Sequence, residues 1–181
     1  PLRGIVPFPG MMLPLLVGRE STLAALDEAQ QHDRMVLMVA QRDEEIEEPT
    51  PEDLYDSGVL AEVVQYLKLP DGNVRVMAEC SRRCEIKGFS STNPGYIKST
   101  FTVIEEAEPR LDESSEALIR YLKGHFEEVV NLSKKIPPEV LQNTQEEKYL
   151  GPLADYIASY LDIKTEERQR VLEMIDPLPR A

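Results

Sequence analysis

The sequence predicts an α+β protein in two parts. A compact β-rich part of about six strands is expected at residues 1–108, and a small helical bundle at residues 109–181. Asp71-Gly72 lies between two β-rich runs, a pattern typical of a hairpin. After residues 105–110 (EEAEPR) the spacing of apolar residues changes from period 2 to period 3.6. We therefore expect the boundary between the parts near Pro109.

The expected strands of the β-rich part are short. They lie at residues 4–8, 34–41, 59–69, 73–79, 85–89 and 96–105. A further apolar run, residues 11–17 (MMLPLLV), cannot pair fully because proline lacks the N–H of a central ladder. With prolines also at positions 7 and 9, this opening segment should lie at a sheet edge or in loops. Together the strands favour a compact, partly closed sheet.

Two short helices are expected among these strands. Residues 21–31 carry apolar side chains at helical spacing, with Ser21 as the N-cap. Thr50 is the expected cap of the second helix, with Pro51 at its first position, acidic residues in its first turn and Gly58 after its end.

The second part is predicted to be helical. Residues 113–136 form a long amphipathic helix that ends before Pro137-Pro138. Its expected apolar stripe consists of Leu118, Leu122, Phe126, Val129, Leu132 and Ile136. A short helix should start near Pro138, and two more are expected at residues 152–161 and 165–175. The last has Thr165 as its expected N-cap.

Composition limits the classes of function. The net charge of −13 repels phosphate backbones, so we expect no nucleic-acid partner. No apolar run has the length of a membrane span and no signal peptide is present, so we expect a cytoplasmic protein without membrane contact. Cys80 and Cys84 are too few for a disulfide framework and fit a reducing compartment.

The sequence contains no recognisable catalytic, cofactor-binding or metal-binding constellation. His32 and His125 are the only histidines, and neither belongs to a pattern of nucleophile and base. There is no phosphate-binding loop, so ATP is not expected to bind this chain. Cys80 and Cys84 lack the further ligands of a zinc site, and the acidic residues 43–53 lack the spacing of a calcium loop.

The candidate binding residues lie in the opening segment. Phe8, Met11, Met12 and Leu13 are bulky apolar residues on a chain that its prolines keep from pairing fully. Methionine adapts its shape to different partners, and exposed apolar surface is a common site of protein contact. The same residues could equally line the β core, and the sequence does not separate these two interpretations.

Segments along the whole chain resemble the N-terminal domain of the Lon protease family. They are residues 1–20 (PLRGIVPFPGMMLPLLVGRE), 39–41 (VAQ), 49–55 (PTPEDLY), 67–72 (LKLPDG), 74–76 (VRV), 134–139 (KKIPPE) and 153–155 (LAD), with Arg83 and Ile86 at further typical positions. Cys80 stands where the family commonly has glycine, and Cys84 where it has a small residue, so turn geometry there is open.

The resemblance implies a PUA-like pseudo-barrel, of the kind also found in cereblon, followed by a helical bundle. It implies a chain cut before the long helix that leads to an AAA+ module. The parent would be a hexameric ATP-dependent Ser-Lys endopeptidase that uses ATP and Mg and degrades misfolded, damaged and short-lived regulatory proteins. This domain would recognise such substrates and support the oligomer without catalytic residues or cofactors of its own.

Other functions remain as alternatives. The main one is a free-standing protein of this domain type that acts as a protein-interaction adaptor. A small enzyme is disfavoured because the groups it needs are missing. An RNA-binding β domain is disfavoured by the charge and by the lack of basic residues interleaved with aromatic ones.

Overall fold

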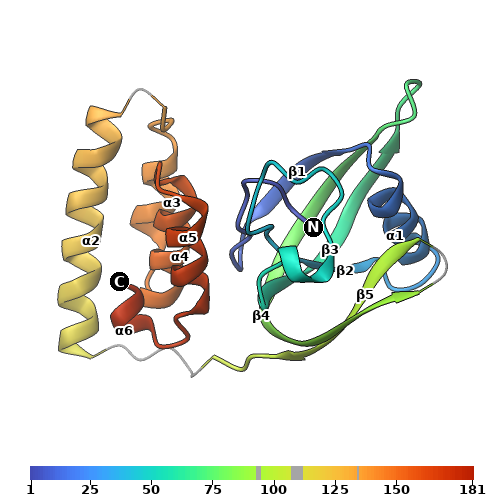
Figure 1. The fold of residues 1–181 in the computed structure, drawn as a ribbon. Coiled ribbons are helices and arrows are strands. Elements are labelled where there is room, and N and C mark those ends of the chain that lie inside the picture. The colour runs from blue at the N-terminus through green and yellow to red at the C-terminus, as the bar shows by residue number, and fades with distance from the viewer. Residues whose placement is uncertain (93–94, 107–111, 134) are drawn as a thin grey trace. The chain divides into compact units, whose positions relative to one another are not determined.

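The computed structural model describes residues 1–92, 95–106, 112–133 and 135–181. The chain forms two compact units, Pro1–Glu105 and Glu106–Ala181, which we describe separately (Figure 1). The predicted boundary near Pro109 lies outside the described residues.

The first unit is built on one antiparallel sheet, which confirms the predicted α+β class. The described strands are β1 (Met12–Val17), β2 (Met35–Met38), β3 (Ser57–Lys68), β4 (Val74–Thr92) and β5 (Tyr96–Val103). Their order is β1-β4-β3-β2, and β5 also pairs with β4. β1 uses the first half of β4, up to Glu79, and β5 uses the second half from Cys84 (Figure 1). β1 therefore lies at the sheet edge, as its proline predicts.

The described sheet has five strands rather than six. Two predicted strands merge, one does not form, and the run at residues 11–17 adds β1, which was not among the six. The predicted strands 73–79 and 85–89 are one continuous strand, β4, because Arg82 and Arg83 pair with Leu60 and Val59 instead of breaking the ladder. The predicted strand at residues 4–8 does not form. Near it, the chain makes only an isolated bridge at Leu2, since prolines at 7 and 9 cannot donate to a ladder.

Local turn signals predicted the hairpin and the short helix correctly. Asp71 and Gly72 connect β3 to β4, with Gly72 at φ +87° and Asp71 Oδ1 accepting from the Asn73 N–H at 3.0 Å. Such a positive φ favours glycine. The short helix η1 (Pro51–Asp53) is fixed by the Asp53 carboxylate, which accepts from both the Thr50 N–H and the Thr50 hydroxyl at 2.8 Å.

Helix α1 (Glu20–Gln30) starts one residue earlier than predicted, and its N-cap is Arg19 rather than Ser21. The Arg19 guanidinium donates to Gln41 Oε1 at 2.8 Å, so a distant contact determines where the chain turns into the helix. Asp27 then ties α1 to β3, because it accepts from the Tyr66 hydroxyl at 2.6 Å and pairs with Lys68.

The second unit is a bundle of short helices against one long helix. The described helices are α2 (Glu113–Leu132), α3 (Val140–Glu146), α4 (Leu150–Tyr160), α5 (Thr165–Glu173) and α6 (Pro177–Arg180) (Figure 1). Their shared core consists of Ile119, Phe126, Val130, Ile136, Val140, Leu150, Leu153 and Ile157. None of the described helices is long and apolar enough to span a bilayer.

Two details of the bundle differ from the prediction. α2 ends at Leu132, and its buried face includes Ile119 and Val130, whereas the predicted Val129 and Leu132 are 40% and 86% exposed. The helices packed around α2 decide which apolar residues are covered. The N-cap of α5 is Lys164 rather than Thr165, because Glu167 accepts from the Lys164 N–H at 3.1 Å.

Arg180 lies at the end of the bundle with a side chain that is 0% exposed. Its guanidinium contacts the carboxylates of Asp155 and Glu106, each at 3.2 Å. It also donates to the carbonyls of Met174 at 2.7 Å and Ile175 at 2.6 Å. These contacts join the first residue of the unit, the buried face of α4 and the segment after α5.

Replacing Arg180 with methionine should destabilise the helical unit by about 3–5 kcal/mol, because the buried Asp155 loses a charge partner. Urea unfolding followed by circular dichroism measures this change. The matched control is the exposed Arg170→Met, which should alter the free energy of unfolding by less than about 0.5 kcal/mol. Equal losses in the two variants would contradict the role given to Arg180.

Candidate functional site

The structure separates the four residues predicted to bind. Phe8 is 0% exposed and Leu13 is 6% exposed, so both belong to the core of the β unit. Met11 is partly buried, and its Sδ accepts from the Phe8 N–H at 3.1 Å. Met12 is 52% exposed. Of the four, Met12 is the one that offers most of its side chain to a partner.

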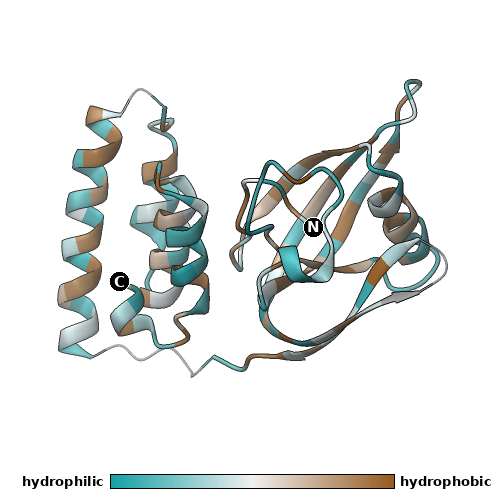
Figure 2. Cartoon of the chain, in the orientation of Figure 1, coloured by the Kyte–Doolittle hydropathy of each residue, from teal (hydrophilic) through white to brown (hydrophobic). Residues whose placement is uncertain are grey.

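The alternation of β1 explains this separation. Successive side chains of a strand point to opposite faces of the sheet. Leu13 and Val17 point inward and are buried, while Met12, Pro14 and Leu16 point outward and are exposed. The strand is apolar at nearly every position (Figure 2). Because its side chains alternate between the two faces, both faces of this edge are apolar.

The exposed side of β1 continues across β4 and β3. Pro14 lies opposite Met77, and Leu16 lies opposite Arg75, which in turn lies opposite Leu67. We call this surface the outer face. It consists of Met12, Pro14, Leu16, Leu67 and Met77. Leu16 is 66% exposed and Leu67 is 50% exposed. Exposed apolar side chains gathered on one face can form a contact surface for another protein.

Charged side chains accompany the outer face. Arg75 lies between Leu16 and Leu67, and Glu79 lies opposite Met12 with Glu62 beyond it. Apolar side chains thus alternate with charges of both signs, which suits a surface that must stay soluble when nothing is bound.

Of the residues on the outer face, the sequence analysis had named Met12 as a candidate but not Leu16, Leu67 or Met77. The sequence did carry a signal for Leu16 in the run MLPLLV. A strand with one face in solvent should alternate apolar and polar residues, and this run has no polar residue. Leu67 and Met77 carried no such signal, since only the register of β3 with β4 brings them beside β1.

The β unit also has a groove of about 1240 Å³ beside α1. Its walls come mainly from α1, β2 and β5, and Pro1 lies at one side. Tyr96 lines the groove and is 8% exposed, and the Lys98 ammonium lies 5.3 Å from the centroid of its ring. Burial, and then the charge of Arg19, lower the pKa of the Pro1 amine from 8.0 to about 6.

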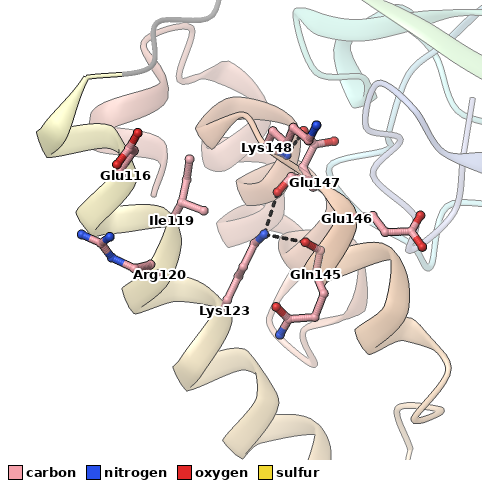
Figure 3. A pocket seen from close by; sticks show the side chains of 8 residues that line it. All are labelled: Glu116, Ile119, Arg120, Lys123, Gln145, Glu146, Glu147 and Lys148. Atoms are coloured by element: carbon pink, nitrogen blue, oxygen red, sulfur yellow. Dashed lines mark hydrogen bonds between the residues drawn. The ribbon is translucent and has the colours of Figure 1, made fainter.

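Another hollow, of about 600 Å³, lies in the helical unit between α2 and the segment after α3 (Figure 3). Lys123 projects into it and donates to the carbonyls of Gln145 at 2.8 Å and Glu147 at 2.7 Å. A lysine at these positions satisfies carbonyls at the end of a helix. Lys123 is therefore used in the fold, joining α2 to the end of α3.

The cysteine, histidine and acidic side chains in the described part of the chain are poorly placed for nucleophilic catalysis or metal binding. Cys80 and Cys84 are buried free thiols. Burial raises the pKa of Cys80 to about 11 and also raises that of Cys84, which disfavours reactive thiolates. No group of three or more His, Cys, Asp or Glu side chains among the described residues is placed to hold a metal ion.

Comparison with known proteins agrees with the fold and with the motifs. Residues 1–181 match the family described as the ATP-dependent protease La (LON) substrate-binding domain. The chain belongs to this Lon family. It is 42% identical over 180 residues to the Lon protease of Desulforamulus reducens, and 41% identical over 181 residues to that of Heliobacterium modesticaldum. Each alignment covers 99% of this chain and 22% of the relative, so the chain spans about a fifth of the length of these curated Lon proteases.

Solved Lon domains share the fold. The N-terminal domain of Mycobacterium avium complex Lon protease superposes with a TM-score of 0.77 at 20% identity, covering 99% of this chain and 90% of that one. A Lon N-terminal domain protein from Xanthomonas campestris gives 0.67 at 13% identity, covering 98% and 89%. At these identities the likeness concerns the fold alone.

The different positions of Phe8 and Met12 in this Lon domain predict different effects on stability. Phe8→Ala should lower the free energy of unfolding by about 3–5 kcal/mol, the usual cost of emptying a buried aromatic site. Met12→Ser should change it by less than about 0.5 kcal/mol, because the side chain is largely in solvent. Chemical denaturation measures the free energy of unfolding of both variants. A large decrease in Met12→Ser would show that the Met12 side chain belongs to the core.

The Pro1 amine predicts a pH dependence for the chain that begins with this residue. With a pKa of about 6 when folded and about 8.0 when unfolded, the unfolded chain binds more protons between these values. Stability should therefore be fully present above pH 8 and fall as the pH drops towards 6, by at most roughly 2–3 kcal/mol. Thermal unfolding of the free and N-acetylated chains at several pH values measures this. If the free and the N-acetylated chain lost stability equally as the pH falls, the pH dependence would belong to groups other than the Pro1 amine.

Proposed function

We propose that this domain binds exposed apolar segments of unfolded or damaged polypeptides on its outer face, as the substrate-recognition part of an ATP-dependent Lon-type protease. The observation that carries the proposal is the outer face itself, a set of exposed and half-buried apolar side chains on one side of β1, β4 and β3, in a chain of the Lon substrate-binding family.

The chemistry of the outer face suits partners of many sequences. An unfolded segment differs from a folded surface mainly in its exposed apolar side chains. Met12 and Met77 can change rotamer to fit them, and Leu16 and Leu67 add apolar area. Such flexible apolar surfaces favour broad rather than sequence-specific recognition.

The position of β1 at the edge of the sheet adds a second contribution to substrate binding. β1 ends the sheet, so its outward main-chain groups can meet an extended polypeptide, while Pro14 removes one N–H from that edge. A proline at an edge also hinders uncontrolled pairing between copies of the domain. The same strand thus offers apolar contact to a substrate and limits aggregation.

Catalysis and ATP use belong, in this proposal, to other parts of the parent protease. The sequence lacks a phosphate-binding loop, and the relatives are Lon proteases of which this domain covers 22%. Hexameric self-association, ATP and Mg are likewise assigned to the parent. The relatives favour this assignment over a free-standing adaptor, because the similarity is to one part of a long protease.

Replacing Met12, Leu16 and Leu67 together with serine should weaken binding of a fluorescently labelled, permanently unfolded protein by at least about tenfold, since exposed apolar anchors carry such contacts. Fluorescence anisotropy measures the affinity, and circular dichroism checks that the variant is folded.

The matched control is Leu132→Ser, which removes an even more exposed leucine (86%) from α2 in the other unit. Its affinity should equal that of the unchanged chain. A folded triple variant that binds as well as the unchanged chain would move the contact surface away from the outer face.

A further inference from the structure

The charged side chains of the outer face stand in a fixed order along β4. Arg75, Met77 and Glu79 point to the same side of the strand, because their positions differ by two. Arg75 and Glu79 are exposed, and Met77 is half-buried. These three side chains form a column with a positive end, an apolar middle and a negative end, over a length of about 13 Å.

The neighbouring strands widen this column into three rows, about 6.6 Å apart along the strands. From the positive to the negative end, with β1 first, then β4 and β3, the rows are Leu16, Arg75 and Leu67; Pro14, Met77 and Gln65; and Met12, Glu79 and Glu62. Apolar contact is therefore available along the whole column, while the charge changes sign from one end to the other.

The positive end has an unpaired cation. Arg75 has no ion-pair partner among the described residues, although the chain has 33 acidic residues. Other basic residues of the β unit do pair with carboxylates, including Arg42, Lys68 and Lys87. The Arg75 guanidinium, between two exposed leucines, is thus open to a carboxylate from a partner.

The negative end has an excess of carboxylates. Glu79 lies directly opposite Glu62, and like charges at directly opposed positions destabilise a sheet. Arg34 contacts the Glu62 carboxylate at 3.9 Å, and no cation in the described part of the chain pairs with Glu79. A basic side chain from a partner would relieve the repulsion between the two carboxylates.

We propose that the outer face prefers unfolded segments in which an acidic and a basic residue stand four positions apart with an apolar residue midway. This preference rests on the proposed function, because it concerns the same surface. In an extended segment, alternate side chains point to one side with the spacing of the rows. The acidic residue then meets Arg75, the apolar residue meets Met77 and the basic residue meets Glu79.

The order of the two charges in the segment does not matter, because a segment can lie along the column in either direction. A segment with two like charges places one of them against a like charge in both directions. A segment whose charges point to opposite sides can satisfy only one end of the column. The apolar rows supply most of the affinity, and the charges select among apolar segments.

The test compares two labelled unfolded polypeptides of identical composition, with blocked ends and no other charged residues. In the first, a glutamate and a lysine stand four positions apart with a leucine midway. In the second, the lysine is exchanged with the threonine that follows it, so the charges stand five positions apart and point to opposite sides. Net charge and apolar content are equal, so only the spacing differs.

Fluorescence anisotropy should show about threefold tighter binding of the first polypeptide, the scale of one exposed ion pair. At about 1 M salt the difference should shrink, because salt screens exposed charges. Arg75→Glu should abolish the difference. The variant that combines Arg75→Glu with Glu79→Arg should restore it, because the column is then reversed. The matched control is Arg170→Glu in α5, which changes the net charge equally and should keep the difference.

Two results would overturn the charge preference alone. One is equal binding of both polypeptides by the unchanged chain, with binding lost when Met12, Leu16 and Leu67 are replaced by serine. The other is a difference that persists in Arg75→Glu. If the unchanged chain bound neither polypeptide, the proposed function would fail together with the preference.

Discussion

The β unit depends on the continuity of β4. This strand pairs with β3 along one side and with β1 and then β5 along the other, so most of the sheet is hydrogen-bonded to it. Register shifts at Leu60/Ala61 and Val63/Gln65 let β3 follow β4 along most of its own length. Because β1 and β5 share one side of β4, neither can extend across it, and β1 is held to the sheet edge where its outward side chains meet solvent.

That constraint produces the outer face. A strand with apolar residues on both faces is usually covered on both faces. β1 instead has only its inner face covered, where Leu13 and Val17 are buried. The apolar residues left outside gain neighbours from β3 and β4 through the register alone. A surface of this kind costs solubility, and the net charge of −13 offsets that cost over the rest of the chain.

The sequence predicted the structure correctly where the deciding contacts join residues close together in the chain. Asp71-Gly72 and the Thr50–Asp53 pair are recognisable because their hydrogen bonds join residues at most three positions apart. It was less informative where distant residues decide the outcome. The start of α1 depends on Gln41, and the buried face of α2 depends on helices that follow it. For the candidate site, composition indicated the opening segment, but only pairing with β4 separates the buried Phe8 and Leu13 from the exposed Met12.

The contacts of Arg180 with Glu106, Asp155 and the segment after α5 form a clasp that has a mechanical consequence. Glu106 and Arg180 are 74 positions apart in the chain, yet a side-chain contact joins them directly. A pulling force applied between these two positions is carried by the clasp before it reaches the helices between them.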